Sequence, residues 1–198
     1  MRTARAVFAA ALLPLALAGC GGITNLPPPV PPSATEVGSS KGADGRFIAF
    51  VGPRRQHAEP FLGVPGTNFY ALRSWLDTRN GERAHQLYVV DSYFGAERNW
   101  EAARDKDGNQ LRFIPISKHE IICENGCSYA EEFAAELPEA LLRASPQGLA
   151  VSFTARSGAA QTILEPGDLV QKQLSAVDAA RAALPVAAAS APPPNPTR

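Results

Sequence analysis

Two cysteines and one histidine form the most specific local chemical pattern in the chain. Cys123 and Cys127 flank Glu124-Asn125-Gly126, and His119 lies four residues before Cys123. Thiolates and imidazole are zinc ligands, but this spacing aligns them only on a helix, and the sequence offers no fourth ligand. Glu-Asn-Gly instead indicates a turn with glycine in a left-handed conformation. We therefore expect a three-residue hairpin loop closed by a Cys123–Cys127 disulfide, without a metal.

A basic loop at residues 53–60 is the second candidate site. It contains Arg54, Arg55 and His57, whose side chains suit an anion or a glycan. A solvated connection between strands is the competing interpretation of the same loop. Arg54, Arg55 and His57 are therefore the predicted ligand contacts.

Aromatic residues on strand-like segments are the third candidate. They could form a platform for a sugar or a peptide, although aromatic rings on strands also fill protein cores. The residues concerned are Trp75, Tyr88, Tyr93, Phe94 and Trp100.

The sequence contains none of the common catalytic motifs. There is no Gly-x-Ser-x-Gly elbow, phosphate loop or paired-histidine metal motif. Residues 105–109 read Asp-Lys-Asp-Gly-Asn, but a calcium loop needs its glycine later, so we predict a hairpin turn. His85, just after Asn80-Gly81, is expected at the surface. The sequence therefore predicts no catalytic residue, no metal and no cofactor.

The N-terminus has the pattern of a secretory signal. Arg2 and Arg5 precede an apolar run over residues 6–17. A membrane-spanning helix needs about 20 apolar residues, so this run is too short to be one. The run ends in Leu17-Ala18-Gly19-Cys20.

In these residues the chain resembles the bacterial lipoproteins, whose lipobox is a leucine, two small residues and a cysteine. The resemblance covers residues 1–20. It implies that Cys20 receives a diacylglycerol, becomes the N-terminus when the signal is removed, and is then acylated, so that lipid anchors the protein to a membrane of the cell envelope. Gly21, where the family uses Asp for inner-membrane retention, favours the outer membrane.

Charge and cysteine count narrow the function further. Removal of residues 1–19 takes away Arg2 and Arg5 of the 19 basic residues and none of the 19 acidic residues, which leaves a formal charge of −2. Such a chain has no basic field for a nucleic acid. In an oxidising compartment, the two cysteines other than Cys20 are expected to pair.

Composition divides the mature chain into three parts. Residues 20–45 are rich in proline, which favours an extended tether between the lipid and the domain. Residues 46–184 are long enough for a single domain with its own core. Residues 185–198 contain Ala, Pro and Ser without periodicity and are expected to be disordered.

Strand patterns dominate the domain. Turn signals separate short runs of β-branched and aromatic residues, so neighbouring strands should be antiparallel. The expected strands are 46–51, 69–75, 85–94, 100–104, 111–117, 149–156 and 160–164. Apolar residues on both faces of 85–94 predict a sheet covered on both sides.

Two segments have helical patterns. Residues 138–144 begin with proline, and residues 168–184 carry an apolar stripe. The expected fold is therefore α+β, mainly β: an antiparallel sheet or sandwich of hairpins, with a short helix and a C-terminal amphipathic helix packed on it.

A Cys123–Cys127 bridge also predicts the register of its hairpin. If the two cysteines are directly opposed, Lys118 faces Glu132 and His119 faces Glu131, which are favourable pairs across strands.

These features favour a non-enzymatic envelope protein that binds an envelope protein or a glycan, or that has a structural role. A hydrolase is the first alternative, and a cleft joining His57 to a serine and an acid would support it. A carrier of apolar ligands is the second, and an internal cavity lined by aromatic side chains would support it.

Overall fold

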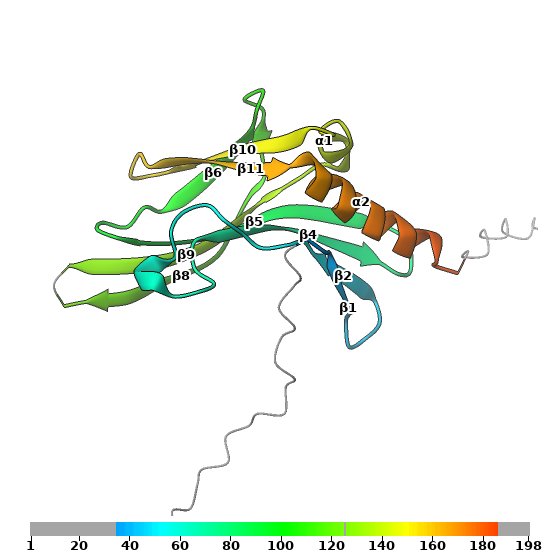
Figure 1. The fold of residues 1–198 in the computed structure, drawn as a ribbon, viewed down its shortest axis with the longest axis horizontal. Coiled ribbons are helices and arrows are strands. Elements are labelled where there is room, and N and C mark those ends of the chain that lie inside the picture. Colours follow the sequence, from blue (N-terminus) through cyan, green and yellow to red (C-terminus); the bar gives the residue numbers. More distant parts are fainter. Residues whose placement is uncertain (1–34, 125, 186–198) are drawn as a thin grey trace, which may run out of the picture. The chain divides into compact units, whose positions relative to one another are not determined.

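The computed structural model describes residues 35–124 and 126–185. These residues form two antiparallel sheets with a short helix and a C-terminal helix, which confirms the expected fold class (Figure 1). Across the larger sheet the strands are β1 (Gly38–Lys41), β2 (Phe47–Val51), β4 (Phe69–Asp77), β5 (Arg83–Phe94), β9 (Cys127–Glu136) and β8 (Phe113–Cys123). A two-residue strand, β3 (Arg55–Gln56), pairs with the same edge of β4 as β2.

The smaller sheet and the helices complete the described part. Across the smaller sheet the strands are β11 (Ala160–Pro166), β10 (Gly148–Ala155), β6 (Trp100–Asp105) and β7 (Gln110–Leu111). The helices are α1 (Glu139–Arg143) and α2 (Gly167–Ala182), and a 3-10 turn, η1, covers Phe61–Gly63. None of these described helices is long and apolar enough to cross a membrane.

One core fills the space between the two sheets and α2. Phe133 of β9 packs against Trp100 and Phe153 of the smaller sheet, at ring-centroid distances of 5.2 and 5.0 Å. The apolar side of α2, including Leu174, joins the same core and contacts both sheets (Figure 1). Each large apolar side chain buried there contributes about 1.5–3 kcal/mol to stability.

Most short-range signals predict the elements correctly. The Asn80-Gly81 turn joins β4 to β5, and Gly81 has a φ of 72°. Residues 157–158 join β10 to β11 in the same way. The helices expected at 138–144 and 168–184 are α1 and α2, and each follows a proline.

The pairing expected around Asp107-Gly108 is wrong in part. Only β7 pairs with β6 after this turn, and the chain then passes into the larger sheet as β8. Phe113 explains the change of sheet, because its ring stacks on Phe133 of β9 at 5.7 Å. This contact lies between segments far apart in the sequence, so turn chemistry gives no sign of it.

The register predicted for the cysteine hairpin holds only near its tip. Cys123 opposes Cys127 and Ile122 opposes Ser128, but a β-bulge between Glu120 and Ile122 shifts the following pairs by one residue. Lys118 therefore opposes Glu131, and His119 opposes Ala130. A bulge inserts one unpaired residue and cannot be found by counting from the turn.

The two ends of the expected domain differ in how far the structure describes them. The larger sheet includes β1, which pairs with β2 and lies within the segment expected to be tether, residues 20–45. Most of that segment, the signal at 1–19 and the expected disordered tail from residue 186 onward lie outside the described residues.

The larger sheet is covered on one face, which corrects the expectation of two covered faces. Residues directly opposed on neighbouring strands share a face, and successive residues alternate between faces. The smaller sheet and α2 pack on the face that carries Leu72, Leu87 and Phe133. Within residues 35–124 and 126–185, no second sheet packs on the other side, and η1 reaches only its end, where Phe61 packs against Phe94. We call this side, defined by Phe69, Arg73, Trp75, Tyr88 and Glu132, the outer face.

Candidate functional site

The cysteine hairpin contains a disulfide. The sulfur atoms of Cys123 and Cys127 are bonded, and their Cα atoms are 4.0 Å apart. A carboxylate oxygen of Glu120 lies within 4.8 Å of both sulfurs, but disulfide sulfurs are not thiolate ligands for a metal. The hairpin is therefore a closed turn in this structure. Cys20 lies outside the described residues.

The three predicted ligand contacts of the basic loop do not converge. Arg54 extends over the ring of Phe69 on the outer face, with its guanidinium carbon 4.6 Å from the ring centroid. Arg55 lies opposite Tyr70 on β4, whose side chain points to the covered side. His57 lies in a hollow between the sheets. Successive side chains of an extended segment point to opposite faces of a sheet, which separates Arg54 from Arg55.

The His57 hollow resembles the cleft that would support a hydrolase. It measures about 460 Å³, and its lining includes His57, Asp91 and Ser92. However, Nε2 of His57 donates to the Val90 carbonyl at 2.8 Å, and Nδ1 accepts from the Gln161 amide at 2.6 Å. Burial also lowers the pKa of His57. Both nitrogens are engaged, so this histidine holds β11 against β5 and leaves no nitrogen for a serine hydroxyl.

Two buried carboxylates fix the segment through which the chain passes from the larger sheet to the smaller sheet. Asp91 and Glu131 oppose each other on β5 and β9. Asp91 accepts hydrogen bonds from Arg98 at 2.7 Å and from the Trp100 indole at 2.9 Å. Glu131 accepts from the Tyr93 hydroxyl and from the backbone N–H groups of residues 99 and 100. Their acceptor oxygens fix the segment that leaves β5 for β6, which is a structural role.

A serine–histidine contact occurs at another place, inside the core. The Ser74 hydroxyl and His85 Nδ1 are 2.8 Å apart, and the Gln173 amide donates to the same hydroxyl at 2.9 Å. Ser74, His85 and Gln173 are 0, 2 and 1% exposed. No substrate can reach a hydroxyl this deeply buried in the folded domain, so the triplet ties α2 to the larger sheet. The expectation that His85 lies at the surface is wrong, because its side chain points to the covered face.

Glu165 is the buried acid with the most perturbed protonation. Burial raises the pKa of Glu165 to about 8, although the nearby Arg55 charge opposes this shift. One of its carboxylate oxygens is buried without a hydrogen-bond partner among the described residues. The neighbouring Tyr70 hydroxyl donates to the Leu164 carbonyl at 2.8 Å. Glu165 is therefore protonated near neutral pH and lies inside the fold.

The outer face carries a layer of aromatic rings and guanidinium groups. Tyr88 lies in the middle of it, opposed by two alanines, Ala71 and Ala134, on the neighbouring strands. The Phe69 ring meets the Tyr88 ring edge-on at 5.9 Å. The Tyr88 hydroxyl donates to Glu132 at 2.6 Å, which together with burial raises the pKa of Tyr88.

Arg73 completes this layer. Its guanidinium carbon is 3.8 Å from the Tyr88 ring centroid and 5.5 Å from that of Trp75, within the range of cation–π attraction. Its Nε is buried without a hydrogen-bond partner in the described part of the chain, and burial lowers its pKa. The ion pairs found among the described residues involve other arginines, so neither Arg54 nor Arg73 is neutralised by a carboxylate within 4.0 Å.

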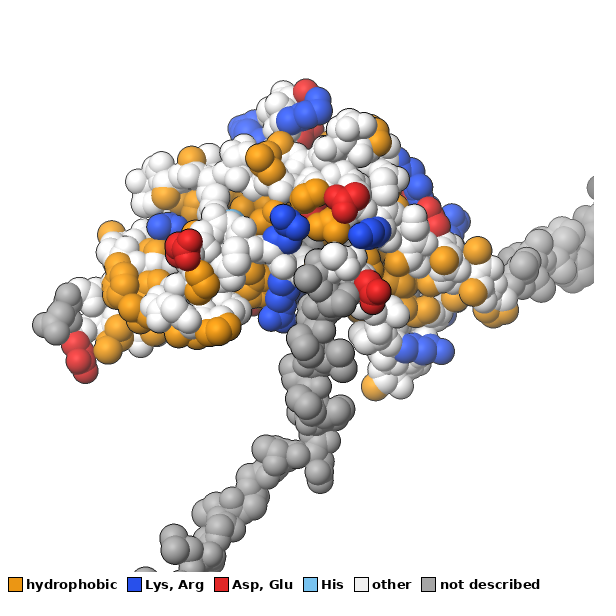
Figure 2. All heavy atoms as spheres, in the orientation of Figure 1, with side chains coloured by type: hydrophobic (Ala, Val, Ile, Leu, Met, Phe, Trp, Pro, Cys, Tyr) orange, Lys and Arg blue, Asp and Glu red, His pale blue; other side chains and the backbone are white. Residues whose placement is uncertain are grey.

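A separate apolar surface occurs at one end of the domain. Figure 2 shows hydrophobic side chains gathered over η1 and the β8–β9 hairpin. Phe61 of η1 packs against Phe94 at 4.7 Å. Leu62, the most exposed large hydrophobic residue at 68%, has a φ of 53°. The other exposed apolar residues of this end are Val64, Ile121 and Ile122. An exposed patch of this kind is typical of a contact surface.

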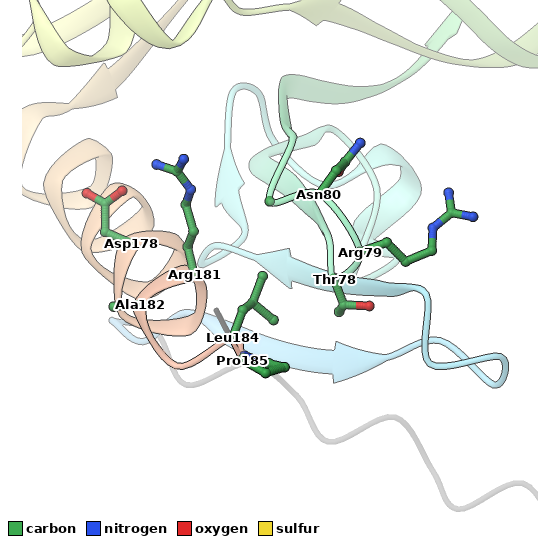
Figure 3. A pocket seen from close by; sticks show the side chains of 9 residues that line it. Thr78, Arg79, Asn80, Asp178, Arg181, Ala182, Leu184 and Pro185 are labelled. Atoms are coloured by element: carbon green, nitrogen blue, oxygen red, sulfur yellow. The ribbon is translucent and has the colours of Figure 1, made fainter. Parts of the chain in front are cut away.

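The hollow in Figure 3 lies between the β4–β5 turn and the end of α2. Its volume is about 500 Å³. Arg79 on its rim pairs with Asp77 at 3.0 Å, and Asp178 accepts from Arg83 and Arg143. Asp178 therefore ties α2 to its neighbours, while Arg181, which also lines the hollow, has no ion pair among the described residues.

The five aromatic residues that the sequence suggested as a platform lie in three different environments. Tyr93 and Trp100 are buried in the core, and Phe94 belongs to the apolar end. Trp75 and Tyr88 lie half-buried on the outer face. Sequence reasoning missed three residues of that face, Phe69, Arg73 and Glu132. The alternation Phe69-x-x-x-Arg73-x-Trp75 places Phe69 and Arg73 on the same side of β4 as Trp75, whereas no sequence signal links Glu132 of β9 to them.

Aromatic rings pack the core between the sheets, and a hollow of about 470 Å³ beside that core is lined in part by Trp100, Phe113 and Phe133. Phe133 contacts Trp100, Phe113 and Phe153 at centroid distances of 5.0–5.7 Å. These rings therefore pack against one another and also form one wall of this hollow. The outer face carries charged and aromatic groups on neighbouring strands of the larger sheet. No protein-family model, curated protein or solved structure matches this chain.

Proposed function

We propose that this protein is a lipid-anchored component of the bacterial cell envelope that binds an envelope partner and does not catalyse a reaction. The anchor is inferred from the lipobox Leu17-Ala18-Gly19-Cys20. Binding is inferred from one observation, the outer face, where Arg73, Tyr88 and Trp75 form a layer that no element of the described chain covers. A tethered domain with such a surface is suited to holding a partner near the membrane.

The hydrogen bonds of the buried polar residues support a binding role. Asp91, Glu131, His57 and His85 each hold one part of the fold against another. A catalytic acid or base needs a proton position that faces a substrate. On the outer face, by contrast, the guanidinium groups of Arg54 and Arg73 lie over aromatic rings without a carboxylate within 4.0 Å among the described residues.

Site-specific photo-cross-linking in intact cells tests the binding surface. A photoreactive residue at Ala84, which lies on the outer face opposite Trp75, is expected to give an adduct with an envelope component. The matched control is Thr154, an exposed position on β10 of the smaller sheet. Adducts from Ala84 alone support the proposal. Equal adducts from both positions, or none from Ala84, would contradict it.

A further inference from the structure

The guanidinium groups of the outer face have hydrogen-bond donors to offer. A guanidinium carries five N–H groups in one plane, and stacking on a ring leaves those groups directed sideways. Arg73 is stacked on Tyr88, and Arg54 on Phe69. Arg73 is half-buried, and its Nε is itself buried without a partner in residues 35–124 and 126–185, so the donors it can offer a ligand are the terminal Nη groups. A carboxylate is the group that such a planar fork binds in a bidentate manner.

The rings and the acid beside these arginines add two more kinds of contact. Trp75 and Tyr88 are half-buried, so each keeps part of its ring surface open. Flat apolar surface of this kind packs against the C–H groups of a sugar ring. Glu132 accepts one hydrogen bond from Tyr88 and, as a carboxylate, has further acceptor capacity for a hydroxyl group.

The location of the layer argues against a peptide added as a strand. Its residues lie on β4, β5 and β9, and the backbone of β5 is paired on both sides. Strand addition needs a free sheet edge, and a bound helix needs an apolar groove. A ligand here must lie across side chains, and it must supply negative charge, hydroxyl groups and apolar C–H surface together.

From these contacts we infer that the outer face binds a saccharide that carries carboxylate groups. Arg73 and Arg54 bind the carboxylates, Trp75 supports a sugar ring, and Glu132 accepts a hydroxyl. This inference rests on the proposed binding role and names its ligand class. Its test uses purified protein, so it can fail while the cross-linking from Ala84 succeeds.

Titration with a defined oligosaccharide tests the inference. The protein is the mature chain, residues 20–198, with Cys20→Ser so that lipid plays no part. The probe is oligogalacturonate, and the comparison ligands are a neutral cello-oligosaccharide of equal length, inorganic phosphate and an acidic peptide. We expect calorimetry to detect oligogalacturonate, with affinity that falls as salt rises. Arg73→Gln and Trp75→Ala should each weaken binding by about tenfold or more.

Two further variants keep the result interpretable. Gln86 lies directly opposite Arg73 on β5, so Gln86→Glu supplies a competing carboxylate without truncating the layer, and it should also weaken binding. Arg156→Gln removes an arginine that is 77% exposed and pairs with Glu101 away from the outer face, and it should bind like the parent chain. Thermal melts establish that each variant is folded.

Several outcomes would overturn the inference. They are no detectable binding of oligogalacturonate, equal binding of the neutral oligosaccharide, and equal losses in Arg73→Gln and Arg156→Gln. Full competition by inorganic phosphate would show a simple anion site. Tighter binding of the acidic peptide would assign the face to a protein partner.

Discussion

At the scale of single residues, the buried charges act through the hydrogen bonds they accept. Glu131 accepts bonds from the Tyr93 hydroxyl and two backbone N–H groups. Glu131→Gln places an amide donor against these donors and should lower the free energy of unfolding by about 1–3 kcal/mol. Urea denaturation measures the change. Glu101→Gln, on the surface, should stay within about 0.5 kcal/mol of the parent. Equal losses in both variants would contradict a structural role for Glu131.

Glu165 predicts a specific pH dependence of stability. Its pKa rises from an ordinary value of 4.5 to about 8 in the folded domain. Between these values the folded state retains a proton that the unfolded chain releases, so stability falls as pH rises, by at most about 1.4 kcal/mol per unit. Below pH 4.5 the contribution is fully present, and above pH 8 it is lost.

Glu165→Gln isolates this effect. The variant should gain stability relative to the parent as pH rises from about 4.5 to 8, because glutamine does not titrate. Thermal melts at several pH values give the difference between the two proteins. A constant difference across this range would show that Glu165 does not carry the raised pKa.

Residue roles were harder to predict than residue positions. His85 follows a turn, which suggests exposure, yet its place on β5 turns it into the core beside Ser74. Arg73 belongs to no sequence motif, because its cation–π contact is with Tyr88 on the neighbouring strand. Both roles depend on the register between strands, which a single sequence does not contain.

At the scale of elements, local chemistry predicted turns and helices, while long-range pairing decided the sheets. Asn80-Gly81 was sufficient to predict the β4–β5 hairpin, because its backbone conformation is determined locally. The bulge between Glu120 and Ile122 and the passage of the chain from β7 to β8 were not predictable in this way. Each depends on packing against β9, a partner that only the folded chain supplies.

The disulfide of the cysteine hairpin should stabilise its own turn and contribute little to the rest of the fold. The Cys123–Cys127 bond closes a very short loop at the tip of β8 and β9. Cys123→Ser with Cys127→Ser should therefore lower stability by about 2 kcal/mol and leave the fold intact. Circular dichroism and thermal melting measure both quantities. Unfolding of the double variant would show that the bridge maintains the whole domain.

At the scale of the whole molecule, the hydrophobic core lies on one face of the larger sheet. The smaller sheet and α2 cover one face of the larger sheet, and the outer face is left to its own side chains. Apolar residues on both faces of β5 predict a sheet covered on both sides, because the pattern alone does not distinguish a face packed against another layer from a face that carries its own aromatic side chains. The outer face also carries Arg54 and Arg73, whose guanidinium groups lie over the rings of Phe69 and Tyr88.

The anchor at Cys20 is the central claim, and lipid labelling measures it directly. Cells grown with an alkynyl fatty acid should label the parent protein in the membrane fraction, and mass spectrometry should find a lipidated Cys20 as its first residue. Cys123→Ser with Cys127→Ser is the matched control and should label equally. Cys20→Ser should lose the label and keep its signal peptide. Unchanged labelling of Cys20→Ser, or a parent protein that begins at another residue without lipid, would contradict the claim.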